Sequence, residues 1–133
     1  MKLSSRFRYG LRLLVDLAVS YEKGPVLLKN IADCERISKK YLEQIVITLR
    51  TAGLIGATRG SKGGYFLIKD PRKIKITDIY KILEGPFAPI DCLDNPKTCT
   101  LIKTCPTRKL WAKLAKSIEE TFASQTLVDL LKK

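Results

Sequence analysis

The chain has 133 residues, of which 45% are hydrophobic, and carries a net charge of +12 without any histidine. This length suits one domain with a real core, and the composition excludes a disordered chain. No run approaches the roughly 20 apolar residues of a membrane-spanning helix, and no signal peptide is visible, so we expect a cytoplasmic protein. Such a basic excess indicates a polyanionic partner, nucleic acid first, although a merely soluble basic surface is the simpler alternative.

Helices and one hairpin are predicted as far as residue 84. Apolar residues recurring at three and four predict helices over residues 5–21 and 28–33, and a third from its N-cap Ser38 until Gly53. The period then changes to two, and the glycine-rich run 60–64 joins two short β-like segments into a hairpin. A fourth helix, capped by Thr77, runs to about Leu83.

The C-terminal part is predicted to be a loop followed by a long helix. Prolines and cysteines make residues 85–105 a loop. Pro106 suits the first position of a helix to about Ser124, and a short helix over 126–131 follows. The long helix carries an apolar seam that exceeds what one small domain needs to cover, which predicts a homodimer; packing on the first helix of its own chain is the alternative. The seam consists of Leu110, Trp111, Leu114, Ile118 and Phe122.

The predicted fold is mainly α with a small β-hairpin, in the order of a winged helix-turn-helix. In that module one helix enters the major groove of double-stranded DNA and the hairpin, called the wing, touches flanking DNA. Residues 36–62 carry six cations against one anion, and cations hold phosphates while Gln and Glu read base edges. A solvated helix face and an ordinary hairpin are the alternative. The candidate DNA contacts are Ser38, Lys39, Lys40, Tyr41, Glu43, Gln44, Arg59, Gly60 and Lys62.

Three cysteines of the loop, Cys92, Cys99 and Cys105, are candidate metal ligands. Thiolates suit iron–sulfur clusters, Cu(I) and zinc, and in a reducing compartment such a cluster indicates metal binding before disulfides. The spacing C-x6-C-x5-C fits zinc poorly, because zinc sites use closer pairs, and fits a larger cluster better. Three unmetallated thiols, as redox sensors or inert groups, are the alternative. Cys34 is expected to be a small buried residue.

Several motifs along the chain occur in one order. They are Met1 to Arg12, Ser38-x-x-Tyr41-Leu42-Glu43-Gln44, Arg59-Gly60-x-Lys62-Gly63-Gly64-Tyr65, Leu83-Glu84-Gly85-Pro86, the three cysteines, Pro106-Thr107 and Leu110-Trp111. Together they resemble the Rrf2 family of bacterial winged-helix regulators, and especially its iron–sulfur regulators, over nearly the whole chain. The resemblance implies a homodimeric transcription factor, with the long helix as dimer seam, and a cluster, commonly [2Fe–2S], held by the three loop cysteines.

The chain departs from the family pattern at the fourth ligand. Relatives carry a histidine three residues after the last cysteine, where this chain has Arg108. Others borrow a ligand from the partner's first helix, where this chain has Arg8 and Arg12, which cannot ligate a metal. A weak fourth ligand implies a labile cluster, suited to sensing iron–sulfur status, oxygen or nitric oxide. The candidates are Asp91, Asp94, Thr107, Asp16, Glu43, water or a small thiol.

The predicted organisation is therefore a DNA-binding domain over residues 1–84, a sensor loop over 85–105, and a dimerisation helix with a C-terminal helix over 106–133. Two rival functions stay open. One is a cluster-free regulator of the same fold that senses thiols or a partner protein. The other is a small iron–sulfur electron carrier, which the charge and the element order disfavour. An enzyme is not expected, because the chain lacks a histidine base, a nucleophile elbow and a phosphate loop.

Overall fold

The computed structural model describes residues 2–131 and is mainly helical with one two-stranded hairpin, as predicted. Met1 and residues 132–133, which the first and last predicted segments include, lie outside the described residues. The α-helices are α1 (Ser5–Val19), α2 (Leu28–Glu35), α3 (Lys39–Thr51), α4 (Ile76–Glu84), α5 (Asp91–Asp94) and α6 (Arg108–Ala123). The strands are β1 (Ile55–Thr58) and β2 (Gly64–Leu67), and the 3-10 helices are η1 (Pro71–Lys73), η2 (Pro96–Thr98) and η3 (Leu127–Leu131).

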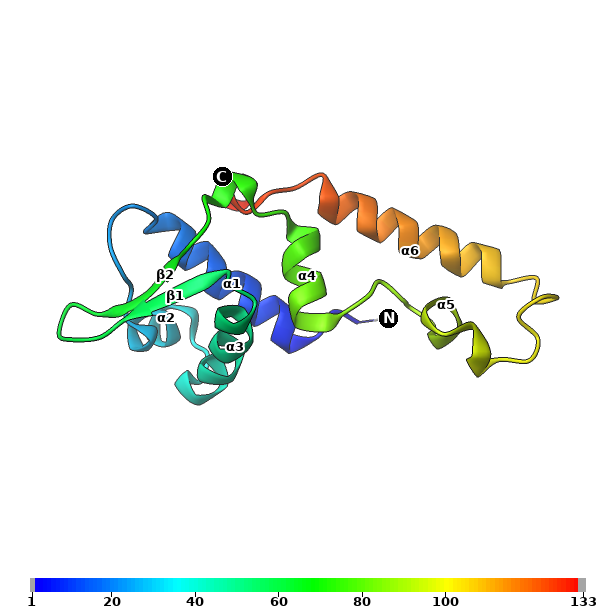
Figure 1. Cartoon of the computed structure of the whole chain (residues 1–133), viewed down its shortest axis with the longest axis horizontal. Helices are drawn as coiled ribbons and strands as arrows, with labels where there is room; N and C mark the ends of the chain where they lie inside the picture. Colours follow the sequence, from blue (N-terminus) through cyan, green and yellow to red (C-terminus); the bar gives the residue numbers. More distant parts are fainter. Residues whose placement is uncertain (1, 132–133) are drawn as a thin grey trace.

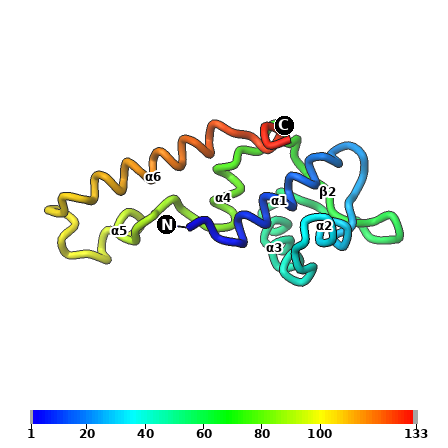
Figure 2. Tube along the Cα trace, turned by 180° about the vertical axis from the view of Figure 1, so that it is seen from behind, coloured from blue at the N-terminus to red at the C-terminus, as the bar shows by residue number. Residues whose placement is uncertain are grey.

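The molecule is elongated and has two parts. We call the part made of α1 to α4, the hairpin, η1 and η3 the head, and residues 85–123 the arm. Figures 1 and 2 show that the hairpin and the tip of the arm lie at opposite ends of the molecule, with α4 between them. None of the described helices is long and apolar enough to cross a membrane.

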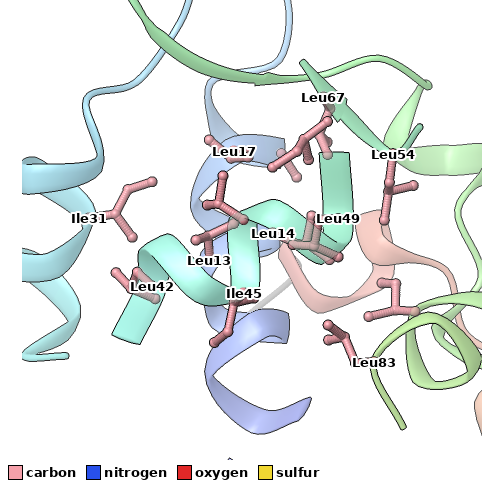
Figure 3. Close-up of a cluster of buried hydrophobic side chains, with 14 of the residues drawn as sticks. Leu13, Leu14, Leu17, Ile31, Leu42, Ile45, Leu49, Leu54, Leu67 and Leu83 are labelled. Carbon is pink, nitrogen blue, oxygen red and sulfur yellow. The ribbon is translucent and has the colours of Figure 1, made fainter. Parts of the chain in front are cut away.

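The core of the head forms between α1, α2, α3, α4 and β2. Leu14 and Leu49 are fully buried, and Figure 3 shows side chains of α1 and α3 meeting there. The spacing of Leu11, Leu14, Val15, Ala18 and Val19 in the sequence predicts one buried apolar stripe on α1, and this prediction is only partly right. Leu13 and Leu17 are buried, whereas Val19 is 54% exposed. The helix has apolar residues on more than one face, so periodicity alone does not show which face the core covers.

Local sequence signals explain where several elements begin and end. The Ser38 hydroxyl accepts a hydrogen bond from the Tyr41 amide, which confirms the predicted N-cap of α3. Gly53, with φ +77°, follows the end of that helix. The hairpin is antiparallel and pairs Ile55 with Leu67 and Thr58 with Gly64.

Three local predictions are wrong. Thr77 does not cap α4: the helix begins at Ile76, and the buried Thr77 hydroxyl finds no hydrogen-bond partner among residues 2–131. Residues 85–105 are not all loop, because α5 and η2 form there; Asn95 caps η2, and proline is tolerated in a first turn. Pro106 is not the first residue of α6, which begins at Arg108 after Thr107.

The segment after α6 returns to the head. Leu127 is fully buried in the core, and its amide donates a hydrogen bond of 2.8 Å to the carbonyl of Ile74. The Ile76 amide donates to the carbonyl of Gln125 at 3.1 Å. The helix expected over 126–131 is observed as η3, which packs on α1 and η1.

Candidate functional site

The exposed face of α3 carries four of the nine candidate DNA contacts. Lys39, Lys40, Glu43 and Gln44 are all exposed. The opposite face of the helix is buried in the core through Leu42, Ile45, Val46 and Leu49. The core therefore fixes the orientation of α3 and leaves a charged and amide-bearing face free to meet a ligand.

Tyr41 differs from the other candidates on this helix. Its ring is half-buried and meets the ring of Tyr9 edge-on, with centroids 5.7 Å apart and an interplanar angle of 82°. The Ser38 hydroxyl is occupied by its capping bond. Ser38 and Tyr41 therefore hold the start of α3 in place, and the exposed residues Lys39, Lys40, Glu43 and Gln44 remain available for surface contacts.

The hairpin presents its cations at an exposed tip. Arg59, Gly60 and Lys62 are exposed, and the Gly63 amide donates to the Gly60 carbonyl at 3.0 Å to close the turn. The base of the hairpin is held by paired hydrogen bonds of 2.8 Å between Val26 and Tyr65. The tip is thus a protruding loop that places two positive charges away from the core.

The three loop cysteines lie in the arm. All are free thiols; Cys92 in α5 and Cys105 are half-buried, and Cys99 is exposed. Within residues 2–131, the one set of three Cys, Asp or Glu ligand atoms that lie within 4.8 Å of one another is elsewhere, in the head. The loop thiols therefore do not converge on a point that would hold a single ion.

The surroundings of Cys105 favour its thiolate. Its sulfur lies 3.3 Å from the Thr107 hydroxyl, and hydrogen bonding to Thr107 and the nearby charge of Arg108 lower the pKa of the thiol. The Arg108 guanidinium donates to the carbonyl of Cys92 at 3.3 Å, and its Nε is buried without a hydrogen-bond partner in the described chain. Arg108 therefore joins two of the cysteine positions, although it cannot ligate a metal.

The candidate fourth ligands are spread over both parts of the molecule. Asp91 and Asp94 are the first and last residues of α5, on either side of Cys92, and both are exposed. Thr107 contacts Cys105. Asp16 and Glu43 belong to α1 and α3 of the head. Within one chain, the arm itself offers the oxygen atoms nearest in sequence to the thiols.

Cys34 is exposed, so the expectation of a buried residue is wrong. It lies near the end of α2, whose buried residues are Leu28, Ile31 and Ala32, and it falls off that face. Its sulfur is the third member of the set in the head, with carboxylate oxygens of Asp16 and Glu35. Glu35 also forms an ion pair of 2.7 Å with Arg12.

The Asp16 carboxyl in this set has a perturbed pKa. Burial, together with the neighbouring Glu35 carboxyl, raises its pKa from 3.8 to about 6, while Arg12 opposes the shift. A raised pKa in the folded state means that the native protein binds more protons than the unfolded chain between these values. Asp16 therefore contributes stability at pH 4 that is lost as the pH rises through about 6.

Asp16→Asn is expected to remove this pH dependence. The variant should gain about 1 kcal/mol of unfolding free energy relative to the wild type at pH 7, a figure discounted for solvent screening of a half-buried group. The gain should shrink towards pH 4, where the wild-type carboxyl is protonated. Urea unfolding of both proteins between pH 4 and 8 measures the difference, and a difference independent of pH would contradict the assignment.

The residues of the seam predicted on α6 do not all face the same surroundings. Phe122 packs inside its own chain, with ring centroids 5.6 Å from Phe7 and 5.7 Å from Tyr80. Leu110 and Leu114, in contrast, are 58% and 40% exposed. Ala115 is the one buried residue of α6. The outer edge of the helix is thus an apolar surface that its own chain leaves open.

A groove on the head adds to this open apolar surface, and the sequence did not reveal it. It has a volume of about 450 Å³ and is lined mainly by apolar residues of α1 and of the chain ends. Its apolar lining includes Leu3, Phe7, Leu11, Val15, Phe122 and Leu130. The second apolar face of α1 is the sequence signal that could have indicated it.

Comparisons with known proteins identify relatives over nearly the full chain. A family model described as Rrf2, iron-dependent transcriptional regulator, matches residues 3–133. The transcriptional regulator CymR of Bacillus subtilis is 39% identical over 130 residues, which are 98% of this chain and 89% of CymR. Protein rrf2 of Nitratidesulfovibrio vulgaris is 39% identical over 132 residues, covering 99% of this chain and 88% of that protein.

Solved structures of relatives have the same fold. The structure of B. subtilis CymR, described as the global cysteine regulator, superposes with a TM-score of 0.82 at 39% identity and covers 98% of this chain and 95% of its own. The structure of T. potens IscR superposes with a TM-score of 0.83 at 40% identity and covers 99% and 87%. The expected family resemblance is therefore confirmed.

Proposed function

The chain belongs to the Rrf2 family of transcriptional regulators, and on that premise we propose that it acts as a cytoplasmic homodimer that reads operator DNA and senses iron–sulfur status through its loop cysteines. The family and the fold are those of regulators and not of enzymes, as expected. The observation that carries the proposal is the separation of a basic surface on the head from the thiol-bearing arm. We call this surface, made by the exposed residues of α3 and the tip of the hairpin, the reading face.

The DNA-reading part rests on α3 and the tip of the hairpin. Both are exposed, both carry cations, and the core holds both in one head. Lys39, Lys40, Arg59 and Lys62 supply the charges that phosphates attract, and Glu43 and Gln44 supply groups that hydrogen-bond base edges. A single reading helix specifies only a few base pairs, so two heads related by a two-fold axis would give a usable operator of two half-sites.

Dimerisation would cover the open edge of α6. An amphipathic helix of sixteen residues with one buried residue gains little stability from its own chain. The exposed Leu110 and Leu114, together with the groove of α1, offer apolar surface that a second copy of the chain would bury. Burial of this surface is the driving force that we assign to the dimer.

Cys92, Cys99 and Cys105 would hold the cluster, most simply a [2Fe–2S] cluster. The donor chemistry fits, because the thiols are free and Cys105 is poised to be a thiolate. When bound, such a cluster supplies an oxidisable iron–sulfur group. The tip of the arm and the hairpin lie at opposite ends of the molecule (Figures 1 and 2). Because of this distance, residues 85–105 would affect DNA binding by changing how the two heads of the dimer are placed relative to each other. A coupling of about 1–3 kcal/mol is typical of such linkage.

Anaerobic purification followed by iron and acid-labile sulfide analysis tests the sensing proposal. We expect iron and sulfide in equal amounts, a visible absorbance band, and loss of all three in Cys92→Ser. Cys34→Ser is the matched control, since this exposed thiol lies in the head, and it should keep the cluster. A chain that stays free of iron after full reconstitution would overturn cluster binding and leave the DNA-reading part intact.

A second candidate is a cluster-free regulator that responds through its thiols. Hydrogen bonding to Thr107 lowers the pKa of Cys105 and so favours a reactive thiolate, and Arg108, which occupies the position of the relatives' histidine, adds to this effect. CymR, described as a global cysteine regulator, is a relative at 39% identity. Iron-free protein whose DNA affinity changes after mild oxidation, and recovers with a reductant, would favour this candidate.

Arg59→Ala is expected to weaken operator binding and to lower its dependence on salt. Loss of one phosphate-neutralising charge reduces the slope of log affinity against log salt by about one. Binding titrations at salt concentrations of about 50 to 200 mM measure the change in this slope. Arg72→Ala is the control, because that exposed arginine is engaged by Asp70 at 2.6 Å and lies outside the hairpin. An unchanged slope would exclude Arg59 from the interface.

A further inference from the structure

The most exposed large apolar side chain of the described residues is Ile47, in the middle of α3. Its side chain is 65% exposed. Leu101, at 64%, and Leu110, at 58%, come next, but both lie in the arm, and Leu110 is on the open edge of α6, where a second copy would cover it. Ile47 lies on neither that edge nor the groove of α1, so the open apolar surface of the arm does not explain it.

Helix geometry places Ile47 on the same side of α3 as three of the candidate DNA contacts. With about 3.6 residues per turn, residues three, four and seven positions apart share one side of a helix. Gln44, Glu43 and Lys40 precede Ile47 by three, four and seven positions, and all are exposed. Leu42, Ile45 and Leu49 point the other way into the core, as Figure 3 shows.

We infer that Ile47 reads a thymine by packing against its 5-methyl group in the major groove. The inference rests on the proposed DNA-reading role of α3. Among the groups that base pairs present in the major groove, the thymine methyl is the apolar one, and aliphatic side chains are its usual partners. The cations that flank Ile47 along the chain, Lys40 and Arg50, and the tip of the hairpin would hold the phosphates on either side.

The side chain itself suits this task. Isoleucine is branched at Cβ and has one strongly preferred χ1 rotamer in a helix, so little side-chain freedom is lost on contact. The hydroxyl of Thr51, one turn further on, donates to the Ile47 carbonyl at 2.8 Å and is turned back onto the helix. Apolar contact is therefore what this part of the face offers to a base.

The test removes the methyl group from the DNA rather than from the protein alone. A duplex is selected from a random pool with the wild-type protein, and each thymine is then replaced singly by deoxyuridine. At one position in each half-site, we expect the replacement to lower wild-type affinity about three- to fivefold, the scale of burying one methyl group. Ile47→Ala should bind the thymine and deoxyuridine duplexes equally.

Val19→Ala is the matched control. Val19 is also β-branched and 54% exposed, but it ends α1 away from the reading face, so this variant should keep the wild-type preference for thymine. Tolerance of deoxyuridine at every position, or an Ile47→Ala protein that still prefers thymine, would overturn the inference while leaving DNA binding intact. Failure to select any duplex would instead overturn the proposed function of α3.

Discussion

Leu110→Glu combined with Leu114→Glu is expected to give a folded monomer that no longer binds its operator. Both side chains are exposed on the open edge of α6 in the single chain, so the new charges should cost the folded monomer little stability. In a symmetric dimer, the same change buries four carboxylates without partners, at about 2 kcal/mol or more each. A total on the order of 8 kcal/mol raises the dimer dissociation constant by roughly a hundred-thousandfold or more.

Sedimentation velocity and operator binding at micromolar concentration measure this result. Ala112→Glu provides the control, because Ala112 is exposed on α6, two positions from Leu110 and two from Leu114, and therefore faces away from them. The control protein should stay dimeric and bind DNA. A double variant that sediments as a dimer would show that the interface lies elsewhere, and the groove of α1 would be the next surface to test.

Gly64→Ala is expected to destabilise the hairpin strongly. Gly64 has φ +146°, a conformation that residues with a side chain rarely adopt. A β-carbon there would also lie 2.5 Å from the carbonyl carbon of Val26, whose backbone pairs with Tyr65. Backbone cannot yield as a flexible side chain does, so we expect a loss of about 2–4 kcal/mol in unfolding free energy.

Chemical denaturation measures this loss, and Gly60→Ala separates its two causes. Gly60 also has a positive φ, +107°, but a β-carbon there meets nothing within 4 Å. The control should therefore show only the conformational cost, about 1 kcal/mol. If both variants lose the same amount, the contact with Val26 carries no weight, and the positive φ alone explains why these positions are glycine.

Local chemistry made the head predictable from the sequence. The cap at Ser38, the glycine after α3 and the glycine-rich turn between β1 and β2 each depend on a few neighbouring residues, and each was found where predicted. The same local signals misled at Thr77 and Pro106. A threonine or a proline near a helix start has several acceptable places, and packing of the rest of the chain selects among them.

Contacts between distant parts of the chain were less predictable. The seam of α6 recurs regularly in sequence, yet Phe122 turns to its own head while Leu110 stays exposed. Periodicity gives the faces of a helix but not their partners. The exposure of Cys34 and its approach to Asp16 and Glu35 likewise depend on how α1 meets α2. The proximity of Arg108 to Cys92 depends on the fold of the arm.

The return of η3 to the head imposes an order on biosynthesis. Leu127 is fully buried in the core, yet it follows the whole arm in the sequence. During synthesis, Leu127 is therefore added after the rest of the head and the whole arm. Until then, the place that Leu127 fills in the core of the head stays open. Contacts between segments so distant in sequence slow folding. A chain cleaved or stalled within the arm would lose the closing piece of its reading head together with its sensor.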